Sequence, residues 1–388
     1  MLLNSQEIPA LSHYVELRFD LRRRSKIVTL VLNLILSGLA PGQSRNVKTI
    51  QPLPVEFVRM FSADADVHGS RTPCQHLRDL AKPTAPAVDT TERPAACDQV
   101  LNILAGKPDP SDEKAAVPIQ AAKIAVDARG RVLITEPAKR MVHVLDFENR
   151  RYTRINGAKD DRMAYPYAVA ADAANRIYVT DLERGRIAVY DANGKFVKYI
   201  GRFKREGLFD RPHSIAIDRA TGRIFLADTA RGFVLILDLD GKILAQIGKR
   251  GGGDGPGEFR KPSEIALYEQ NVFVFDQQTS RIQVLDFDGH FQRQFALAAS
   301  GLIEVRGIAF DAQGRLLVST AYMVKGFDQE GKFLFDFGMN GTRPGDFNTT
   351  GGICTDEKNR AYAIDVGNSR IQVFQMSGEA KSKTEASQ

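Results

Sequence analysis

The sequence predicts an all-β fold: a six-bladed β-propeller of four-stranded antiparallel blades, closed by a strand from the amino-terminal segment. Three observations support this. One phrase recurs six times at a nearly constant spacing after residue 118. Each copy is followed by short apolar segments that turn residues separate. The composition, with no Trp, 22 Phe, 32 Gly and 17 Pro, favours short strands joined by many turns over long helices.

Residues 1–42 have the features of a signal peptide or membrane anchor. A basic cluster over residues 22–26 precedes an apolar run over residues 27–40, whose length suits a signal peptide better than a full membrane span. The small residues Ala40 and Gly42 predict cleavage after Gly42. We therefore expect an extracytoplasmic protein, periplasmic or secreted, with anchoring by the uncleaved run as the alternative.

Residues 43–117 form an amino-terminal extension rich in Pro, Thr, Ala and Asp, with weak periodicity. Two apolar patches, residues 55–61 and residues 100–104, are candidate strands within it. Each has the length of a typical strand. The extension is therefore expected to contribute a strand to the domain that follows.

The three cysteines show no C-x-x-C spacing of the kind that zinc and redox sites use. In an exported chain, Cys74 and Cys97 are candidates for a disulfide, and unpaired thiols are the alternative. Cys354 lies in an apolar strand pattern and is expected to be a buried free thiol.

The first copy of the repeated phrase is Ile-Ala-Val-Asp, which ends at residue 127, and the copies define the propeller over residues 118–376. Successive copies are 45, 46, 50, 43 and 45 residues apart, a period in which one repeat holds one four-stranded blade. A ring is preferred to a sandwich because similar units must bury their faces against each other, and six units in a ring leave no terminal face. The copies end at Asp127, Asp172, Asp218, Tyr268, Asp311 and Asp356.

The third copy shows the four strands of a blade in order. Strand patterns over residues 214–218, 223–228 and 233–238 follow one another closely. An Asp240-Gly241 step then leads to the fourth pattern over residues 243–247. Asp-Gly permits the positive φ angles that a tight hairpin requires. Each copy is thus expected to form one antiparallel sheet.

The sixth copy ends with an apolar pattern at residues 370–374 and lacks an obvious fourth strand. An unpaired edge would invite aggregation, so another segment is expected to pair there. Residues 55–61 and residues 100–104 are the two candidates. Residues 377–388 are polar and are expected to be a disordered tail.

These residues resemble the NHL repeat, whose blades carry Pro-x-x-Ile-Ala-x-Asp, then Ile-Tyr-Val-x-Asp, then Arg-Ile-x-Val after a four-residue gap. The resemblance covers residues 118 to about 376. It implies a six-bladed propeller and a binding surface on the face where the links between blades lie. The last spacing is kept by Asp181 and Arg186, by Asp276 and Arg281, and by Asp365 and Arg370.

Some copies depart from the pattern. Phe233 replaces the arginine of the third copy, Glu136 and Met141 alter the first, and the fifth lacks the acidic residue after its second strand. The first blade is therefore expected to be degenerate and the fifth irregular. Groups that recur in most repeats serve the repeat's own turns, so the Asp and Arg are interpreted as structural.

Basic residues gather in two links between blades and are candidates for a basic patch. The net charge is +6, of which +2 lies in residues 1–42, too little to indicate a nucleic-acid binder. No aromatic residues for base stacking are interleaved with these charges. The candidates are Arg202, Lys204, Arg205, Arg211, Lys249, Arg250, Arg260 and Lys261.

Ligand-binding candidates lie where the inner strands begin. They are Tyr167, His213, Glu264 and Arg306, which bring aromatic, titratable, acidic and basic groups to one end of the ring. One lyase family on the six-bladed fold holds a metal with several histidines, but here only His213 occupies such a position, so no metal site is expected.

These observations predict an exported module that binds or scaffolds a protein, a peptide or a glycan through one end of the ring. The first alternative is a lyase or hydrolase that uses His213, Glu264 and Arg306. The second is a polyanion or RNA binder that uses the basic links. No catalytic motif or cofactor pattern is present in the sequence. A monomer is expected, with nucleic acid a disfavoured partner and membrane contact only through an uncleaved amino terminus.

Overall fold

The computed structural model of the 388-residue chain describes residues 55–61, 121–149, 151–158, 161–201, 208–297 and 304–377. Leu53–Gln388 form one compact unit. The expected export segment, the strand candidate at residues 100–104, both cysteines of the proposed disulfide and the tail from residue 378 lie outside the described residues. No helix in the described part of the chain is long and apolar enough to cross a membrane.

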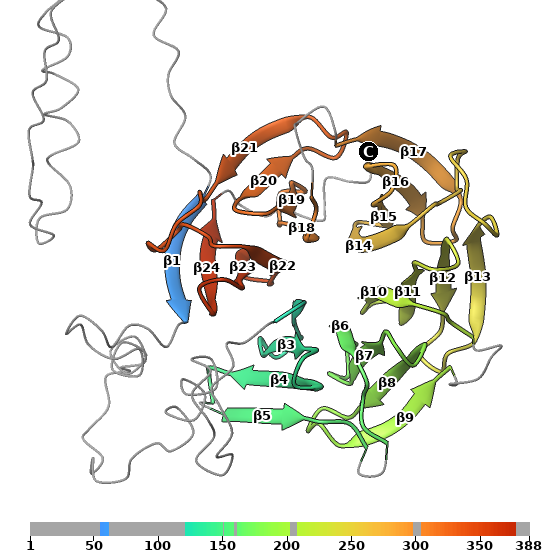
Figure 1. The fold of residues 1–388 in the computed structure, drawn as a ribbon, viewed down its shortest axis with the longest axis horizontal. Coiled ribbons are helices and arrows are strands. Elements are labelled where there is room, and N and C mark those ends of the chain that lie inside the picture. Colours follow the sequence, from blue (N-terminus) through green and yellow to red (C-terminus); the bar gives the residue numbers. More distant parts are fainter. Residues whose placement is uncertain are drawn as a thin grey trace, which may run out of the picture. The chain divides into compact units, whose positions relative to one another are not determined.

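Every regular element of the described residues is a β-strand, and the strands form six four-stranded antiparallel sheets. Figure 1 shows the sheets as six blades around one axis, so the predicted propeller is confirmed. The strands of blades 1 to 3 are β2 (Ile124–Val126), β3 (Val132–Glu136), β4 (Met141–Asp146), β5 (Arg151–Ile155), β6 (Pro166–Ala171), β7 (Ile177–Asp181), β8 (Arg186–Tyr190), β9 (Phe196–Ile200), β10 (Pro212–Asp218), β11 (Arg223–Asp228), β12 (Phe233–Leu237) and β13 (Ile243–Gly248). Those of blades 4 to 6 are β14 (Pro262–Tyr268), β15 (Asn271–Asp276), β16 (Arg281–Asp286), β17 (Phe291–Ala296), β18 (Gly307–Phe310), β19 (Leu316–Ser319), β20 (Val324–Phe327), β21 (Phe333–Phe337), β22 (Thr350–Thr355), β23 (Arg360–Asp365), β24 (Arg370–Met376) and β1 (Val55–Phe61).

Strand β1 closes the ring. It pairs antiparallel with β24 and becomes the outer strand of blade 6, so residues from both ends of the chain share one sheet. The partly buried Val55 packs against the apolar cluster between blades 5 and 6. Of the two candidates, the closing strand is therefore residues 55–61, as an exposed β24 edge requires.

The core consists of six apolar clusters, one at each interface between neighbouring blades. The cluster between blades 6 and 1 joins Ile134 and Leu145 to Tyr362 and Ile371, which completes the ring. Because each blade is covered on both faces, its middle strands are almost entirely buried, as the apolar runs in the sequence predict.

The links and turns follow the sequence pattern. Phe209, Phe259 and Phe347, one in each of three glycine-rich links, are buried between neighbouring blades. Gly241 has a φ of 93° in its hairpin, and a Cβ there would lie 2.3 Å from Cγ2 of Ile200 in the preceding blade. Glycine is therefore required by both the turn and the packing.

The first and fifth blades are complete despite their divergent sequences. Both contain four paired strands, although β2 has three residues and β18, β19 and β20 have four each. In blade 1, Glu136 stands where other blades have aspartate and contacts His143 at 2.8 Å and Lys139 at 3.3 Å. Glu136 thus pairs with His143 and Lys139 in place of the arginine that the first copy lacks.

Candidate functional site

The inner strands β2, β6, β10, β14 and β18 begin at the same end of the ring axis, which we call the entry end, because residues at or directly before their starts contact one another. Strands β10 and β14 begin with a proline and then a bulge, because the register shifts between Pro212 and Ser214 and between Pro262 and Glu264. A bulged residue leaves the ladder and its side chain is re-aimed. The bulge in β10 therefore presents His213 to the axis, whereas the hydroxyl of the bulged Ser263 is buried 3.4 Å from the carbonyl oxygen of Phe275 in its own blade.

The repeat aspartates fix the links that lead into these strands. Asp228 is fully buried and accepts hydrogen bonds from the backbone N–H groups of Asp210 and Arg211, both at 3.0 Å. Asp276 binds the N–H groups of Arg260 and Lys261 in the same way, at 2.9 Å each. Their geometry is that of structural groups, which satisfy backbone donors and hold each inner strand at a fixed position.

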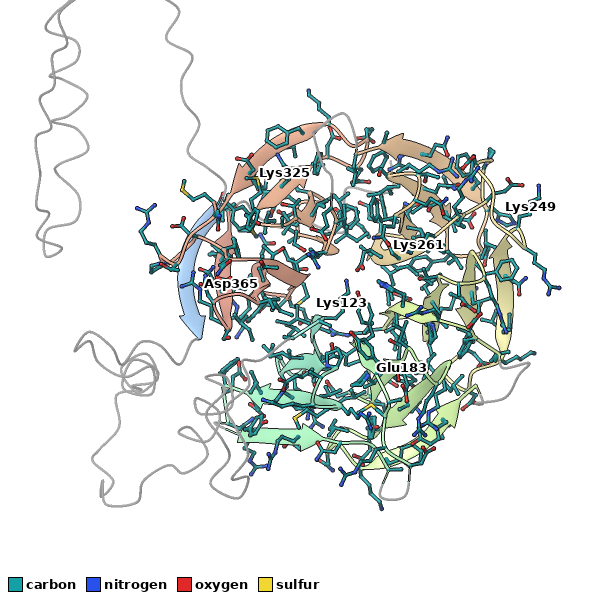
Figure 2. The ribbon with its side chains drawn as sticks, in the orientation of Figure 1. Lys123, Glu183, Lys249, Lys261, Lys325 and Asp365 are labelled. Atoms are coloured by element: carbon teal, nitrogen blue, oxygen red, sulfur yellow. The ribbon has the colours of Figure 1, made fainter. Side chains whose placement is uncertain are left out.

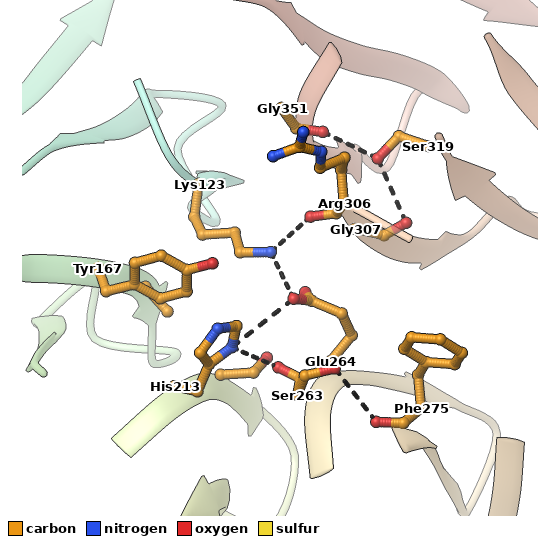
Figure 3. A network of polar contacts seen from close by, with 12 residues as sticks. Lys123, Tyr167, His213, Ser263, Glu264, Phe275, Arg306, Gly307, Ser319 and Gly351 are labelled. Atoms are coloured by element: carbon orange, nitrogen blue, oxygen red, sulfur yellow. Dashed lines mark hydrogen bonds and ion pairs between the residues drawn. The ribbon is translucent and has the colours of Figure 1, made fainter. Parts of the chain in front are cut away.

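Five side chains from five blades converge at the entry end (Figure 3). The Nζ atom of Lys123 lies 2.6 Å from Oε1 of Glu264 and 2.5 Å from the carbonyl oxygen of Arg306. The same Oε1 atom lies 3.7 Å from Nδ1 of His213. The rings of Tyr167 and His213 are 4.2 Å apart, centroid to centroid. Residues far apart in the sequence thus form one polar cluster.

The ion pair of Lys123 and Glu264 is the least exposed part of this cluster. Their side chains are only 10% and 7% exposed, and the pair joins blade 1 to blade 4 across the axis. Burial raises the pKa of Glu264, and the Lys123 ammonium opposes that rise. Breaking a buried pair on one side is strongly destabilising because a charge is left without a partner. The pair is therefore a fixed structural element of the entry end.

His213 is held as a neutral imidazole. Burial and the nearby Lys123 charge lower its pKa to about 3, and Lys261 and Arg211 act in the same direction. Its Nδ1 atom lies 2.8 Å from the carbonyl oxygen of Ser263 and, since a carbonyl only accepts, Nδ1 carries the proton. The close approach to Glu264 is thus not an ion pair at neutral pH. The Nε2 atom keeps a lone pair that can accept a hydrogen bond.

Tyr167 and Arg306 complete the cluster. Burial raises the pKa of Tyr167, so the side chain remains a phenol with a hydroxyl donor. Its ring stacks on Tyr165 at a centroid distance of 6.3 Å. Arg306 is 41% exposed and pairs with Glu304 at 2.8 Å through Nη2, while its buried Nε has no hydrogen-bond partner in the described residues. The entry end therefore offers donors, an acceptor and an aromatic face.

The basic links divide into two groups. Arg211 and Lys261 lie directly before β10 and β14, and their charges lower the pKa of His213. In the second group, Arg260 pairs with Asp254 at 2.5 Å and Lys249 lies 3.7 Å from Glu258. Figure 2 shows Lys261 toward the centre of the ring and Lys249 at its periphery. Arg250 is exposed, and Arg202, Lys204 and Arg205 lie outside the described residues.

Within the described residues, no group of three or more His, Cys, Asp or Glu side chains is placed to hold a metal ion. His143 is buried in β4, and His290 is exposed beside a hairpin turn. Cys354 carries a free thiol that is partly buried, and burial raises its pKa. These residues take no part in the entry-end cluster.

A hollow of about 720 Å³ lies at the opposite end of the axis, where the inner strands finish. Three of its carboxylates, Asp127, Asp311 and Asp356, each bind the arginine four residues later at 2.6 to 2.7 Å. Those groups stabilise the turns that carry them. Arg129, exposed at the rim, makes no ion pair with a described residue.

Sequence reasoning missed Lys123. Tyr167, His213 and Arg306 lie five residues before the last residue of the repeat phrase, but Lys123 and Glu264 lie four residues before it. At the first of these positions blade 1 has the half-buried Ala122, so comparing that position across the blades gave blade 1 no candidate. The available signal was a charged residue beside an inner-strand start, and a lysine is rarely buried without a partner.

A family model described as a 6-bladed beta-propeller matches residues 203–307. A search of curated proteins found no match. The family match covers blades 3 and 4 and the adjoining links, and it agrees with the fold.

Solved structures similar to this chain include a streptogramin B lyase, with 14% identity, coverage of 67% of this chain and 94% of that chain, and a TM-score of 0.50. A virginiamycin B lyase from Staphylococcus aureus has 14% identity, coverage of 66% and 95%, and a TM-score of 0.50. A gluconolactonase from Xanthomonas campestris has 17% identity, coverage of 76% and 99%, and a TM-score of 0.49. At these identities the likeness to the lyases shows the fold alone.

Proposed function

We propose that this propeller is a binding module of the NHL-repeat kind, which takes a protein segment, a peptide or a glycan at the entry end of its ring. The observation that carries the proposal is the entry-end cluster itself. Tyr167 and His213 are held by their ring contact and by the Ser263 carbonyl, and together with the partly exposed Arg306 they offer polar atoms and a ring face. Such convergent polar groups beside aromatic rings are typical of ligand sites.

Binding is favoured over acid–base catalysis by the protonation states of the cluster. A general base works best when its pKa lies near the working pH, whereas the pKa of His213 is lowered to about 3. The Glu264 carboxylate is engaged by Lys123. Both groups are therefore better suited to hold a ligand than to move a proton at neutral pH.

We further propose that the module works outside the cytoplasm, because the basic cluster and apolar run of residues 22–40 have the order of an export signal. Cell fractionation of the natural host tests this. Recovery of the protein in the cytoplasmic fraction would contradict export and would favour the nucleic-acid alternative.

Affinity capture from the natural host tests the binding proposal. Full-length protein, the double variant Tyr167→Ala with His213→Ala, and the control Arg129→Gln at the opposite end of the axis are compared, after circular dichroism has shown that all three are folded. We expect one species to be retained by the wild type and by Arg129→Gln and lost from the double variant. Equal retention by all three proteins would refute the proposal.

A further inference from the structure

Cations stand directly before four of the six inner strands. Lys123 precedes β2, Arg211 precedes β10, Lys261 precedes β14 and Arg306 precedes β18. Because these four strands begin at the entry end, the four charges lie around the same cluster of side chains. The backbones of Arg211 and Lys261 are each fixed by a buried aspartate. The ring of blades thus holds the charges in a constant arrangement.

The four cations differ in how far the protein neutralises them. The charge of Lys123 is neutralised by Glu264 in a buried ion pair. Arg306 pairs with Glu304, but both side chains are more than 40% exposed, and such pairs contribute little. Two exposed cations of the entry end, Arg211 and Lys261, remain without an ion-pair partner among the described residues.

Arg306 has a donor that the protein leaves unused. Its Nε atom is buried without a hydrogen-bond partner among the described residues, although a buried unpaired donor carries a free-energy cost. Nε and Nη2 lie on the same edge of the guanidinium, and among the described residues the ion-pair partner of Nη2 is the exposed Glu304. A planar carboxylate fits that edge with two parallel hydrogen bonds.

We propose that the ligand of the entry end carries a carboxylate that Arg306 binds, while Arg211 and Lys261 attract it. This inference rests on the proposed function and names its ligand class. The neutral Nε2 of His213 accepts a hydrogen bond from a neighbouring amide or hydroxyl of the same ligand, and the Tyr165 and Tyr167 rings pack against its apolar face. An acidic peptide and a uronic-acid glycan both have this chemistry.

A polyanion fits the same surface less well. Long phosphate chains need a continuous basic stripe, but the outer part of the link before blade 4 is neutralised by its own acidic residues. Positive charge is therefore concentrated at one point, which suits a single anionic group.

Titration of the full-length protein with matched acidic and neutral probes tests the inference. The probes are N-acetylglutamate against N-acetylglutamine and galacturonate against galactose, at equal ionic strength, with binding followed by calorimetry and by the NMR signal of the Arg306 Nε–H group. We expect at least one acid to bind about tenfold or more tightly than its neutral partner. Arg306→Gln should abolish that preference, and Arg129→Gln should preserve it.

The probes distinguish a peptide carboxylate from a glycan carboxylate, and they distinguish failure of this inference from failure of the proposed function. Tighter binding of N-acetylglutamate identifies a peptide, and tighter binding of galacturonate identifies a glycan. The inference would be overturned if the acid and the amide bind equally, if neither acid binds, or if the preference for the acid survives Arg306→Gln. It would also be overturned if inorganic phosphate or an RNA oligonucleotide binds more tightly than the acids. A neutral probe whose binding is lost in Tyr167→Ala would overturn it while leaving the proposed function standing.

Discussion

His213 shows how one buried side chain takes its chemical state from several blades. The Ser263 carbonyl of the next blade fixes the tautomer of His213, and the Lys123 ammonium across the axis disfavours the protonated form. Packing against Tyr167 shields the imidazole from water. The imidazole is consequently an acceptor rather than an acid or base at neutral pH. This state has a measurable effect on stability.

The stability of the protein should fall between pH 6.5 and pH 3 because of His213. The unfolded chain binds a proton on this imidazole near pH 6.5, but the folded protein does so only near pH 3. Between these values the unfolded state holds more protons, so the free energy of unfolding decreases as the pH falls. His213→Asn, which keeps a donor for Ser263, should reduce the slope by up to about 1.4 kcal/mol per pH unit.

Urea unfolding measured at several pH values between about 4 and 7.5 gives this slope. His290→Asn is the matched control, because it removes an imidazole that is exposed beside a hairpin turn. Equal slopes in the wild type and in His213→Asn, or an equal change in both variants, would contradict the assigned state of His213.

At the scale of the strand and its turn, blades 2, 3 and 4 each use aspartate in two different tasks. One aspartate, such as Asp228, ends the second strand and holds the incoming link from within the core. Another, such as Asp238, lies in the hairpin before the outer strand and accepts the N–H groups of Asp240 and Lys242. The two carboxylates accept the same number of backbone hydrogen bonds and differ chiefly in burial.

Asp228→Ala should therefore destabilise the protein by about 2 kcal/mol, since two donors are left without a partner in the interior. Part of the full penalty is offset because burial raises the pKa of Asp228, which indicates that its charge is itself costly to bury. Asp238→Ala should cost less than about 1 kcal/mol, because water replaces the lost acceptor. Equal losses in denaturant unfolding would show that burial does not decide the role of these residues.

At the scale of the whole molecule, the ring depends on joining the two ends of the chain. Six apolar interfaces hold six blades, and the last blade is complete only when β1 pairs with β24. Without β1, the backbone of β24 and the apolar side chains beside Val55 would face water. Closure therefore converts a row of repeats into one cooperative unit.

Removal of β1 should weaken the entire propeller. A chain of residues 118–388 should unfold with a free energy lower by about 3 kcal/mol or more than a chain of residues 53–388, from the loss of strand hydrogen bonds and apolar burial. A synthetic peptide of residues 53–63, added to the shorter chain, should restore part of the loss. If both chains unfold at the same denaturant concentration, β1 is not what closes the ring.

Much of the fold follows from local patterns that repeat. The spacing of the six phrases, the Asp-Gly turn at Gly241 and the link residue Phe259 each act within one blade or at one interface, so they are visible in a single stretch of sequence. The need for a closing strand followed from the missing outer strand of the sixth copy. The choice of β1 required the pairing itself.

The sequence by itself determined the fold class, the number of blades and the end of the ring where Tyr167, His213 and Arg306 would meet, because a repeat places equivalent positions at equivalent points. Only the tertiary structure decided their chemistry. Lys123 and Glu264 lie 141 residues apart and become partners because blades 1 and 4 face each other across the axis. Burial, tautomer and charge at the entry end depend on such distant neighbours, which no local pattern encodes.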